Sequence, residues 1–270
     1  MNAYRMLGAL TAAGLLLGSC GGGSGSTPAN GGANASGTAS PGKRATAAAK
    51  PTGSTTNAAA GYAVPASCAS LRIDPAATLP GGTVGKCWAE ALYAHGSMRA
   101  FTSGPPAQTG EIVLRPQLKF SSKSSDGDQA ILVDNQGYRL KDGRWIKGDK
   151  NSDDYDEVIT GSMVDLVKGL YSPSGISAVI AACPTYAVDP RRVSVTFEDK
   201  SVHSDLVHLT CTSSFPMIGT TVSDSALWVR SDWTPIRGVS TATFGGSSAT
   251  SAVEYSDHGK AFEITAPSAG

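Results

Sequence analysis

Residues 21 to 60 lack every residue type from which a core is built: Val, Ile, Leu, Met, Phe, Trp, Tyr and Cys are all missing. Gly, Ala, Ser, Thr and Pro fill 34 of these 40 positions. Such a stretch cannot bury enough apolar surface to offset its chain entropy. We therefore expect a disordered linker over residues 20–60 and one folded domain over residues 61–270. About 210 residues suffice to bury roughly 70% of the surface of an unfolded chain.

An excess of charge of either sign is also missing. The chain has 22 basic and 22 acidic residues. Four of the basic residues and none of the acidic ones precede residue 61, which leaves the domain with 18 basic against 22 acidic residues. This small negative balance excludes the basic footprint of a nucleic-acid binder and an electrostatic attraction to an anionic membrane surface. We expect no nucleic-acid partner.

The usual signatures of catalysis are absent too. The motifs G-x-S-x-G, H-E-x-x-H and G-x-G-x-x-G do not occur, and neither does a P-loop. Nucleophilic, zinc-hydrolytic and nucleotide chemistry therefore lack their usual residues. We expect a protein that is not an enzyme and that has no catalytic residue, no metal and no cofactor.

The N-terminus has the features of an export signal. One positive charge, Arg5, precedes an apolar run from Met6 to Leu17. As a helix this run would be about 18 Å long, too short to cross a hydrocarbon layer of roughly 30 Å and typical of a signal peptide. We expect residues 1–19 to be removed as a lipoprotein signal peptide.

Leu17-Gly18-Ser19-Cys20, at the end of this run, resembles the bacterial lipobox, in which the cysteine receives a diacylglycerol thioether. Two acyl chains on Cys20 would suffice for stable membrane anchoring. The linker would then act as a leash with a mean reach of roughly 35 Å. The predicted location is extracytoplasmic, anchored to the outer face of the cell membrane. The alternative is a general secretory signal next to which Cys20 is incidental.

Four cysteines remain in the domain: Cys68, Cys87, Cys183 and Cys211. An even number in an exported chain is typical of disulfides. Of the three possible connectivities the local one is favoured, Cys68 with Cys87 and Cys183 with Cys211, each closing a loop worth roughly 3 kcal/mol in a chain-entropy treatment. A zinc site is the competing interpretation, but no pair has the C-x₂₋₄-C spacing.

Periodicity predicts an α+β domain. Helical spacing occurs over residues 87–98, 158–170 and 176–180. Alternation and turn residues predict about ten antiparallel strands, at residues 112–114, 118–120, 131–133, 138–140, 145–147, 193–197, 207–211, 226–230, 236–244, 249–255 and 261–265. Cys211 shares a strand face with Val207 and Leu209, the side that the helices should cover. The expected fold is a large curved antiparallel sheet with two or three helices over one face.

Two polar clusters are candidate metal sites. His203 and Asp205 share a strand face, but His208 does not. The acidic run over residues 149–157 begins like a calcium loop, yet it lacks the glycine at the sixth position and has Thr160 in place of the bidentate glutamate. Capping of the following helix is the favoured role of this run, and weak calcium binding is the alternative.

Three segments, residues 135–147, 227–237 and 253–267, carry a family resemblance. They hold a hairpin with Tyr138 and Trp145, a second with Trp228 and Pro235, and a closing stretch from Tyr255 through Ile264-Thr265-Ala266-Pro267. Over roughly residues 88–267 the chain thereby resembles the mycobacterial LppX/LprAFG lipoproteins. The resemblance implies a fold like the LolA lipoprotein carrier, a half-barrel whose concave face is covered by helices around an apolar cavity for acylated lipids or glycolipids. The four cysteines of the domain are not part of that pattern.

The apolar residues that would line such a cavity have two interpretations, because an ordinary packed core needs the same residue types. The residues that we predict to line it are Leu118, Phe120, Ile131, Val133, Ile159, Met163, Leu166, Val167, Leu170, Val195 and Phe197.

The leading hypothesis is a membrane-anchored, monomeric lipid or glycolipid carrier of an actinobacterial-type envelope. Its rationale is that two chains of about 16 carbons would expose apolar surface worth roughly 25 kcal/mol in water. The alternative is an envelope interaction or sensor module with a fully packed core and a protein partner. A metal-dependent enzyme using His203, Asp205 and His208 is the third hypothesis.

Overall fold

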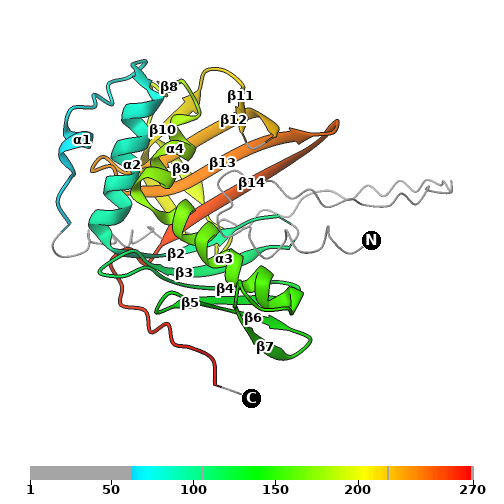
Figure 1. The fold of residues 1–270 in the computed structure, drawn as a ribbon. Helices are drawn as coiled ribbons and strands as arrows, with labels where there is room; N and C mark the ends of the chain where they lie inside the picture. The colour runs from blue at the N-terminus through cyan, green and yellow to red at the C-terminus, as the bar shows by residue number, and fades with distance from the viewer. Residues whose placement is uncertain (1–61, 105, 218, 269–270) are drawn as a thin grey trace, which may run out of the picture.

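A computed structural model describes residues 62–104, 106–217 and 219–268. The predicted signal peptide at 1–19, Cys20 and the linker at 20–60 lie outside these residues. The described chain forms one large antiparallel sheet with its helices on one side (Figure 1). The predicted fold class, a curved antiparallel sheet covered by a few helices, is confirmed.

The sheet contains 14 strands rather than about ten, all in antiparallel pairs. Their order is β1-β8-β10-β12-β13-β14-β2-β3-β4-β5-β6-β7, and β9 and β11 pair off this path with β10 and β12. The bounds are β1 Thr78–Pro80, β2 Ser97–Thr102, β3 Gln108–Val113, β4 Lys119–Ser124, β5 Gln129–Val133, β6 Gln136–Lys141, β7 Arg144–Lys147, β8 Thr185–Val188, β9 Val193–Thr196, β10 Val202–Cys211, β11 Phe215–Met217, β12 Thr220–Val229, β13 Pro235–Phe244 and β14 Ser247–Ser256.

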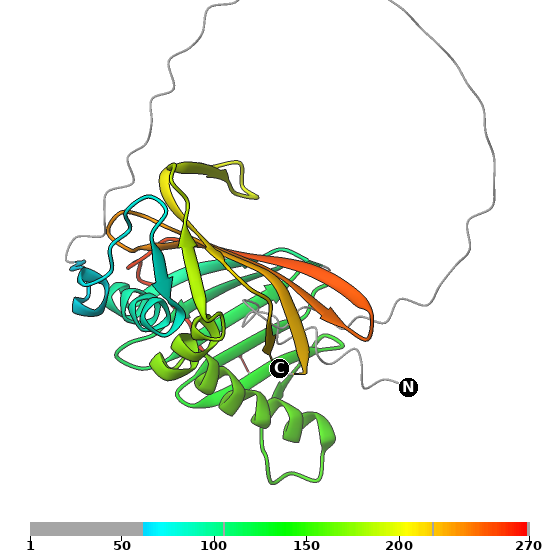
Figure 2. The same ribbon diagram turned by 90° about the horizontal axis from the view of Figure 1, so that it is seen from above.

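The sheet has two arms. The N-terminal arm is the meander β2 to β7, and the C-terminal arm comprises β8, β10, β12, β13 and β14. Pairing of β14 with β2 joins the two arms. Seen from above, the yellow and orange strands of the C-terminal arm arch over the green strands of the N-terminal arm (Figure 2).

Four helices occur in the described residues: α1 Ala66–Ala69, α2 Gly81–His95, α3 Tyr155–Tyr171 and α4 Pro173–Ala181. Asp154 caps α3, because its side chain accepts hydrogen bonds from the backbone N–H groups of Asp156 and Glu157. The capping role predicted for the acidic run is thus confirmed. Ser172 caps α4 in the same way, followed by a proline at the first helical position.

No helix in the described part of the chain combines the length and the apolar character that a membrane span requires.

The main core lies between α2, α3, α4 and the face of the sheet that they cover, which we call the inner face. Trp88 of α2 is fully buried and meets Tyr255 of β14 edge to face, with ring centroids 6.1 Å apart. Val84 and Leu92 fall on the same buried side of α2. Burying a large apolar side chain contributes about 1.5–3 kcal/mol, so α2 is a principal element of the core.

Both favoured disulfides are present. Cys68–Cys87 fastens α1 to α2, and Cys183–Cys211 ties the end of α4 to the end of β10. Cys211 packs against the main core together with Leu209, so it lies on the helix-covered side, as the alternation predicted.

Two predicted elements are wrong. The helix expected over residues 87–98 begins already at Gly81 and ends at His95, and β2 follows it. Residues 261–265 form no strand, because β14 is already flanked by β13 and β2 and leaves no edge with which another strand could pair. This closing stretch is instead held by Ser97, whose backbone O accepts from Gly259 N and whose Oγ donates to the carbonyl of Lys260.

Three rings pack against one another where the first described residues meet the C-terminal stretch. The rings of Tyr62 and His95 are parallel, with centroids 4.0 Å apart, and those of His95 and His258 are 4.7 Å apart. Burial lowers the pKa of His95 to about 4. Burial, assisted by His95, lowers the pKa of His258 to about 3. Both imidazoles are therefore neutral in the folded protein near pH 7.

We expect stability to fall as the pH drops from 7 to 5. An unfolded histidine takes up a proton near pH 6.5, whereas these two do so in the fold only near pH 4 and 3, so the unfolded state binds more protons in this window. Urea unfolding at pH 7 and at pH 5 measures the slope. His95→Gln and His258→Gln should each flatten it, and a wild-type free energy of unfolding that is equal at both pH values would contradict the assignment.

Candidate functional site

The strand register arranges the inner face of the N-terminal arm in rows. Nearest the helices is an apolar row of four paired, buried residues: Met98, Ile112, Phe120 and Leu132. Two positions further along each strand is a second row: Ala100, Gly110, Ser122 and Ala130. A third row holds Thr102, Gln108 and Ser124. The inner face thus changes from large and apolar to small and then to polar.

The second row, which we call the small row, combines burial with little side-chain volume. Ala100, Ser122 and Ala130 are buried, as is Gly110. Protein interiors are close-packed, and a layer that fills itself needs large side chains at such positions. Ser122 is only 6% exposed, and its hydroxyl has no hydrogen-bond partner among the described residues. The small row therefore offers surface that the sheet itself does not fill.

The C-terminal arm repeats this feature. On β13 the inner-face positions are Gly238, Ser240 and Ala242, all of them buried. Ser225 of β12 pairs with Ser240 and is buried as well. Both arms thus present small residues on the face that they share.

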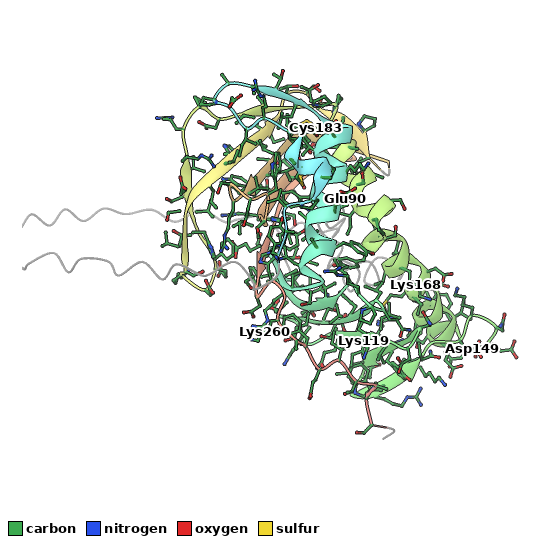
Figure 3. The ribbon with its side chains drawn as sticks, turned by 90° about the vertical axis from the view of Figure 1, so that its left-hand side faces the viewer. Glu90, Lys119, Asp149, Lys168, Cys183 and Lys260 are labelled. Atoms are coloured by element: carbon green, nitrogen blue, oxygen red, sulfur yellow. A yellow bond between two sulfur atoms is a disulfide. The ribbon has the colours of Figure 1, made fainter. Side chains whose placement is uncertain are left out.

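The helices lie over the apolar row. Tyr171, the last residue of α3, packs its ring at 5.9 Å from that of Phe120. Figure 3 shows α2, marked by Glu90, and α3, marked by Lys168, beside the side chains of the sheet. Burial raises the pKa of Tyr171 and that of Tyr255. Both phenols therefore remain neutral, and the environment over this row has few charges.

Only part of the predicted cavity residues come together. Phe120, Met163 and Val167 belong to the main buried core, and Leu118 packs against it. Ile159 and Leu170 are half-buried. Whether any of these residues contacts a ligand stays a prediction.

Four of the predicted residues lie on the other side of the sheet, and their expected face is wrong. Ile131 pairs with Ser121 and Tyr138, so Ile131 and Val133 alternate away from the inner-face residues of β5. Val195 and Phe197 form a separate cluster with Leu206 and Ile236.

A bulge in β10 explains why Val195 and Phe197 lie on the outer side of the sheet. The register shifts between His203 and Leu206, where Asp205 has a φ of 59°. Leu206 consequently joins the outer cluster, while its direct neighbour Val207 joins the main core. Sequence alternation does not reveal such a shift.

The buried side of α3 is also rotated relative to the prediction. Its buried residues are Thr160, Gly161, Met163, Val164 and Val167. Leu166, which was expected to be buried, is 38% exposed. The physical reason is that α3 and β6 approach each other closely. A Cβ on Gly137 of β6 would lie 2.7 Å from Val164 Cγ2, so the contact depends on a glycine and not on a large apolar residue.

The residues proposed for a metal do not converge. The His203 ring packs at a tilt against that of Phe197, with centroids 4.1 Å apart, whereas His208 stacks on Trp228 at 4.5 Å and faces Asp189 at 3.6 Å. Asp205 is exposed. Within the ranges that the structure describes, no three His, Cys, Asp or Glu side chains are grouped so as to hold a metal ion.

Comparison with known proteins gives little further guidance. No protein-family model matches the chain, and no curated protein matches it. Among solved structures, the crystal structure of LprF from Mycobacterium bovis is similar with a TM-score of 0.41 and 12% sequence identity, over 71% of this chain and 99% of that chain. Similarity at this level does not assign the chain to a family.

Proposed function

We propose that this protein is a lipid-anchored, extracytoplasmic protein that binds the acyl chains of a lipid or glycolipid against the inner face of its curved sheet. The observation that carries the proposal is the small row. Ala100, Gly110, Ser122 and Ala130 are buried on the helix-covered side, yet they supply almost no side-chain volume. Acyl chains are slender and apolar, so they suit a surface of small side chains next to the apolar row.

The benefit of such a protein follows from the solubility of its ligand. Each CH₂ group of an acyl chain costs about 0.8 kcal/mol in water, so a lipid with two long chains leaves a membrane very rarely without help. A protein surface that replaces the membrane environment removes this cost. The proposed role is binding and carriage without chemical conversion of the ligand.

Location supports this role. The two disulfides are typical of an oxidising compartment. The proposed diacylglyceryl group on Cys20 would hold the domain near the membrane, with the linker as a leash.

A matched pair of serine variants tests the proposal. Ser121 and Ser122 are neighbours on β4, but Ser122 lies in the small row and Ser121 lies on the opposite face. We expect Ser122→Leu to weaken binding at least tenfold, because even one added methylene in an apolar site costs about 1–3 kcal/mol. Ser121→Leu should bind like the wild type. The measurement is titration of the delipidated full chain with a fluorescent 16-carbon fatty acid, with thermal unfolding to verify the fold.

The absence of bound lipid in native mass spectra of the exported full chain, together with no uptake of the probe, would contradict lipid binding. That result would favour the second hypothesis, an envelope interaction module whose interior is filled by its own side chains. Equal binding of the probe by both leucine variants would instead contradict the small row as the surface on which the acyl chain lies.

A further inference from the structure

Arg139 lies in the middle of β6 on the inner face. It pairs with Ala130, which pairs with Ser122, so Arg139 extends the small row by one strand. Arginine is almost never fully buried unless it is paired, yet Arg139 is only 9% exposed. A guanidinium at this depth needs a physical account.

Helix α3 covers this part of β6. On one side of Arg139, a Cβ on Gly137 would lie 3.0 Å from the carbonyl oxygen of Thr160. On the other side, Lys141 Nζ donates to Asp156 Oδ2 at 2.6 Å. Gly137, Arg139 and Lys141 are alternate residues of one strand and share a face. Arg139 therefore lies beneath α3, between its two contacts with β6.

Arg139 has no counter-charge in the described part of the chain. No hydrogen bond or ion pair joins it to another residue there, and its Nε is buried without a partner. The nearest acid along α3, Asp156, pairs with Lys141, although its Oδ1 is also buried without a partner. An isolated buried charge costs several kcal/mol unless an opposite charge accompanies it.

Two more polar groups near Arg139 lack partners. The hydroxyl of Ser122 lies two strands away in the same row, and that of Thr160 lies on the side of α3 that faces β6. Adjacent strands are about 4.8 Å apart, so the strand positions of Ser122 and Arg139 are separated by about 10 Å, and Ala130 is the residue between them in the row. One donor-only cation and two hydroxyls without partners thus lie on the inner face or on the helix that covers it, along a row with little side-chain volume.

We infer that Arg139 binds an anionic oxygen group, a phosphate or a carboxylate, of the ligand whose acyl chains lie on the inner face. The inference rests on the proposed lipid binding and specifies its ligand class: acylated ligands with a negative group, in preference to neutral ones. A guanidinium binds phosphate or carboxylate through two parallel hydrogen bonds. The hydroxyls of Ser122 and Thr160 are available to complete the set of donors. The site also fixes the orientation of the ligand, with its charge beneath α3 and its chains toward the apolar row.

Arg139→Met tests the inference, because methionine retains an unbranched apolar stem and removes the charge. Arg144→Met is the matched control, since it removes the same charge from an exposed position, the first residue of β7. Three probes are titrated into the delipidated full chain: dipalmitoyl phosphatidate, palmitate and the neutral dipalmitoylglycerol. From the strength of hydrogen bonds to charged groups, we expect Arg139→Met to bind the anionic probes with roughly tenfold to hundredfold lower affinity. We expect no change for the neutral probe and none in Arg144→Met.

A stability measurement separates binding from a structural role. If Arg139 awaits an anion, Arg139→Met should raise the unfolding midpoint of the lipid-free protein, because it removes an unpaired buried charge. A purely structural arginine would instead lower the midpoint on removal. Inorganic phosphate should stabilise the lipid-free wild type and not Arg139→Met.

The three probes distinguish the possible outcomes. If Arg139→Met loses affinity for phosphatidate alone, the site binds a phosphate; if it loses affinity for palmitate as well, the site binds anionic groups in general. Equal losses for all three probes, or none for any, would overturn the inference while leaving acyl binding intact. If no acyl probe binds the wild type, the proposed function fails, and stabilisation by inorganic phosphate alone then decides whether Arg139 binds an anion.

Discussion

Gly81→Ala is expected to destabilise the fold by about 3 kcal/mol or more, a loss at the severe end of single substitutions. Gly81 is the first residue of α2 and donates its N–H to the carbonyl of Pro184 at 2.8 Å. A Cβ at this position would lie 1.7 Å from the carbonyl oxygen of Cys183, which is a backbone atom. Cys183 is fixed by its disulfide to Cys211, so it cannot move away cheaply.

The neighbouring glycine gives the control. A Cβ on Gly82 would meet nothing within 4 Å. Since alanine is preferred to glycine in a helix, Gly82→Ala should leave stability unchanged or raise it by up to about 1 kcal/mol. Thermal unfolding of the two variants measures the difference. At about 2–4 °C per kcal/mol for a chain of this size, we expect the midpoint of Gly81→Ala to fall by roughly 6–12 °C or more. Equal midpoints would refute the close approach.

The second large effect is expected from removing the disulfide between Cys183 and Cys211. These cysteines are 28 residues apart, and closing a loop of this length restricts the unfolded chain by about 3–4 kcal/mol in a chain-entropy treatment. The bond also anchors α4 to β10, and α4 packs closely along α2 through Gly85. The double variant Cys183→Ala/Cys211→Ala should therefore unfold at a lower temperature by roughly 10 °C.

Comparison with the other disulfide sharpens this expectation. Cys68 and Cys87 are 19 residues apart, so the entropic contribution is only slightly smaller, at about 3 kcal/mol. Cys68→Ala/Cys87→Ala should lower the midpoint by a similar amount, although it releases only the short α1 from α2. A much larger loss at Cys183 and Cys211 would indicate that the second bond also stabilises the packing of the helices. Unchanged midpoints in both double variants would contradict the entropic account.

The sequence allowed the fold class and the disulfides to be predicted, because both depend on local or countable signals. The hairpin from β6 to β7 follows from Asp142-Gly143 between alternating strands, and the structure has it there. The strand β2 was missed because its Ser97 directly follows the end of α2 at Gly96, whose φ is +79°. The apolar residues on both sides of that glycine continue the helical spacing, so periodicity placed the end of the helix too late.

The candidate site was the least predictable part, because only large apolar residues indicate a core or a cavity in a sequence. The small row consists of alanine, glycine and serine, residue types that carry no hydrophobic signal, and only the register places them in one line. Arg139 was equally hidden, since an arginine on a strand is usually an exposed residue. Its burial depends on α3, which packs on β6 through Gly137. Neither contact leaves a pattern within a single segment.

The junction of β14 with β2 has a consequence for biogenesis. The meander from β2 to β7 can assemble from contiguous hairpins as soon as residue 147 is available, but the partner of β2 consists of residues 247–256. During synthesis and translocation, the edge of β2 that will pair with β14 therefore stays unpaired until about a hundred further residues have followed. Exposed strand borders of this kind invite pairing with foreign chains. Truncations before residue 247 should thus yield an incomplete domain that aggregates through the free edge of β2. Pairing of the last strand, β14, is the step that protects the nascent protein from aggregation.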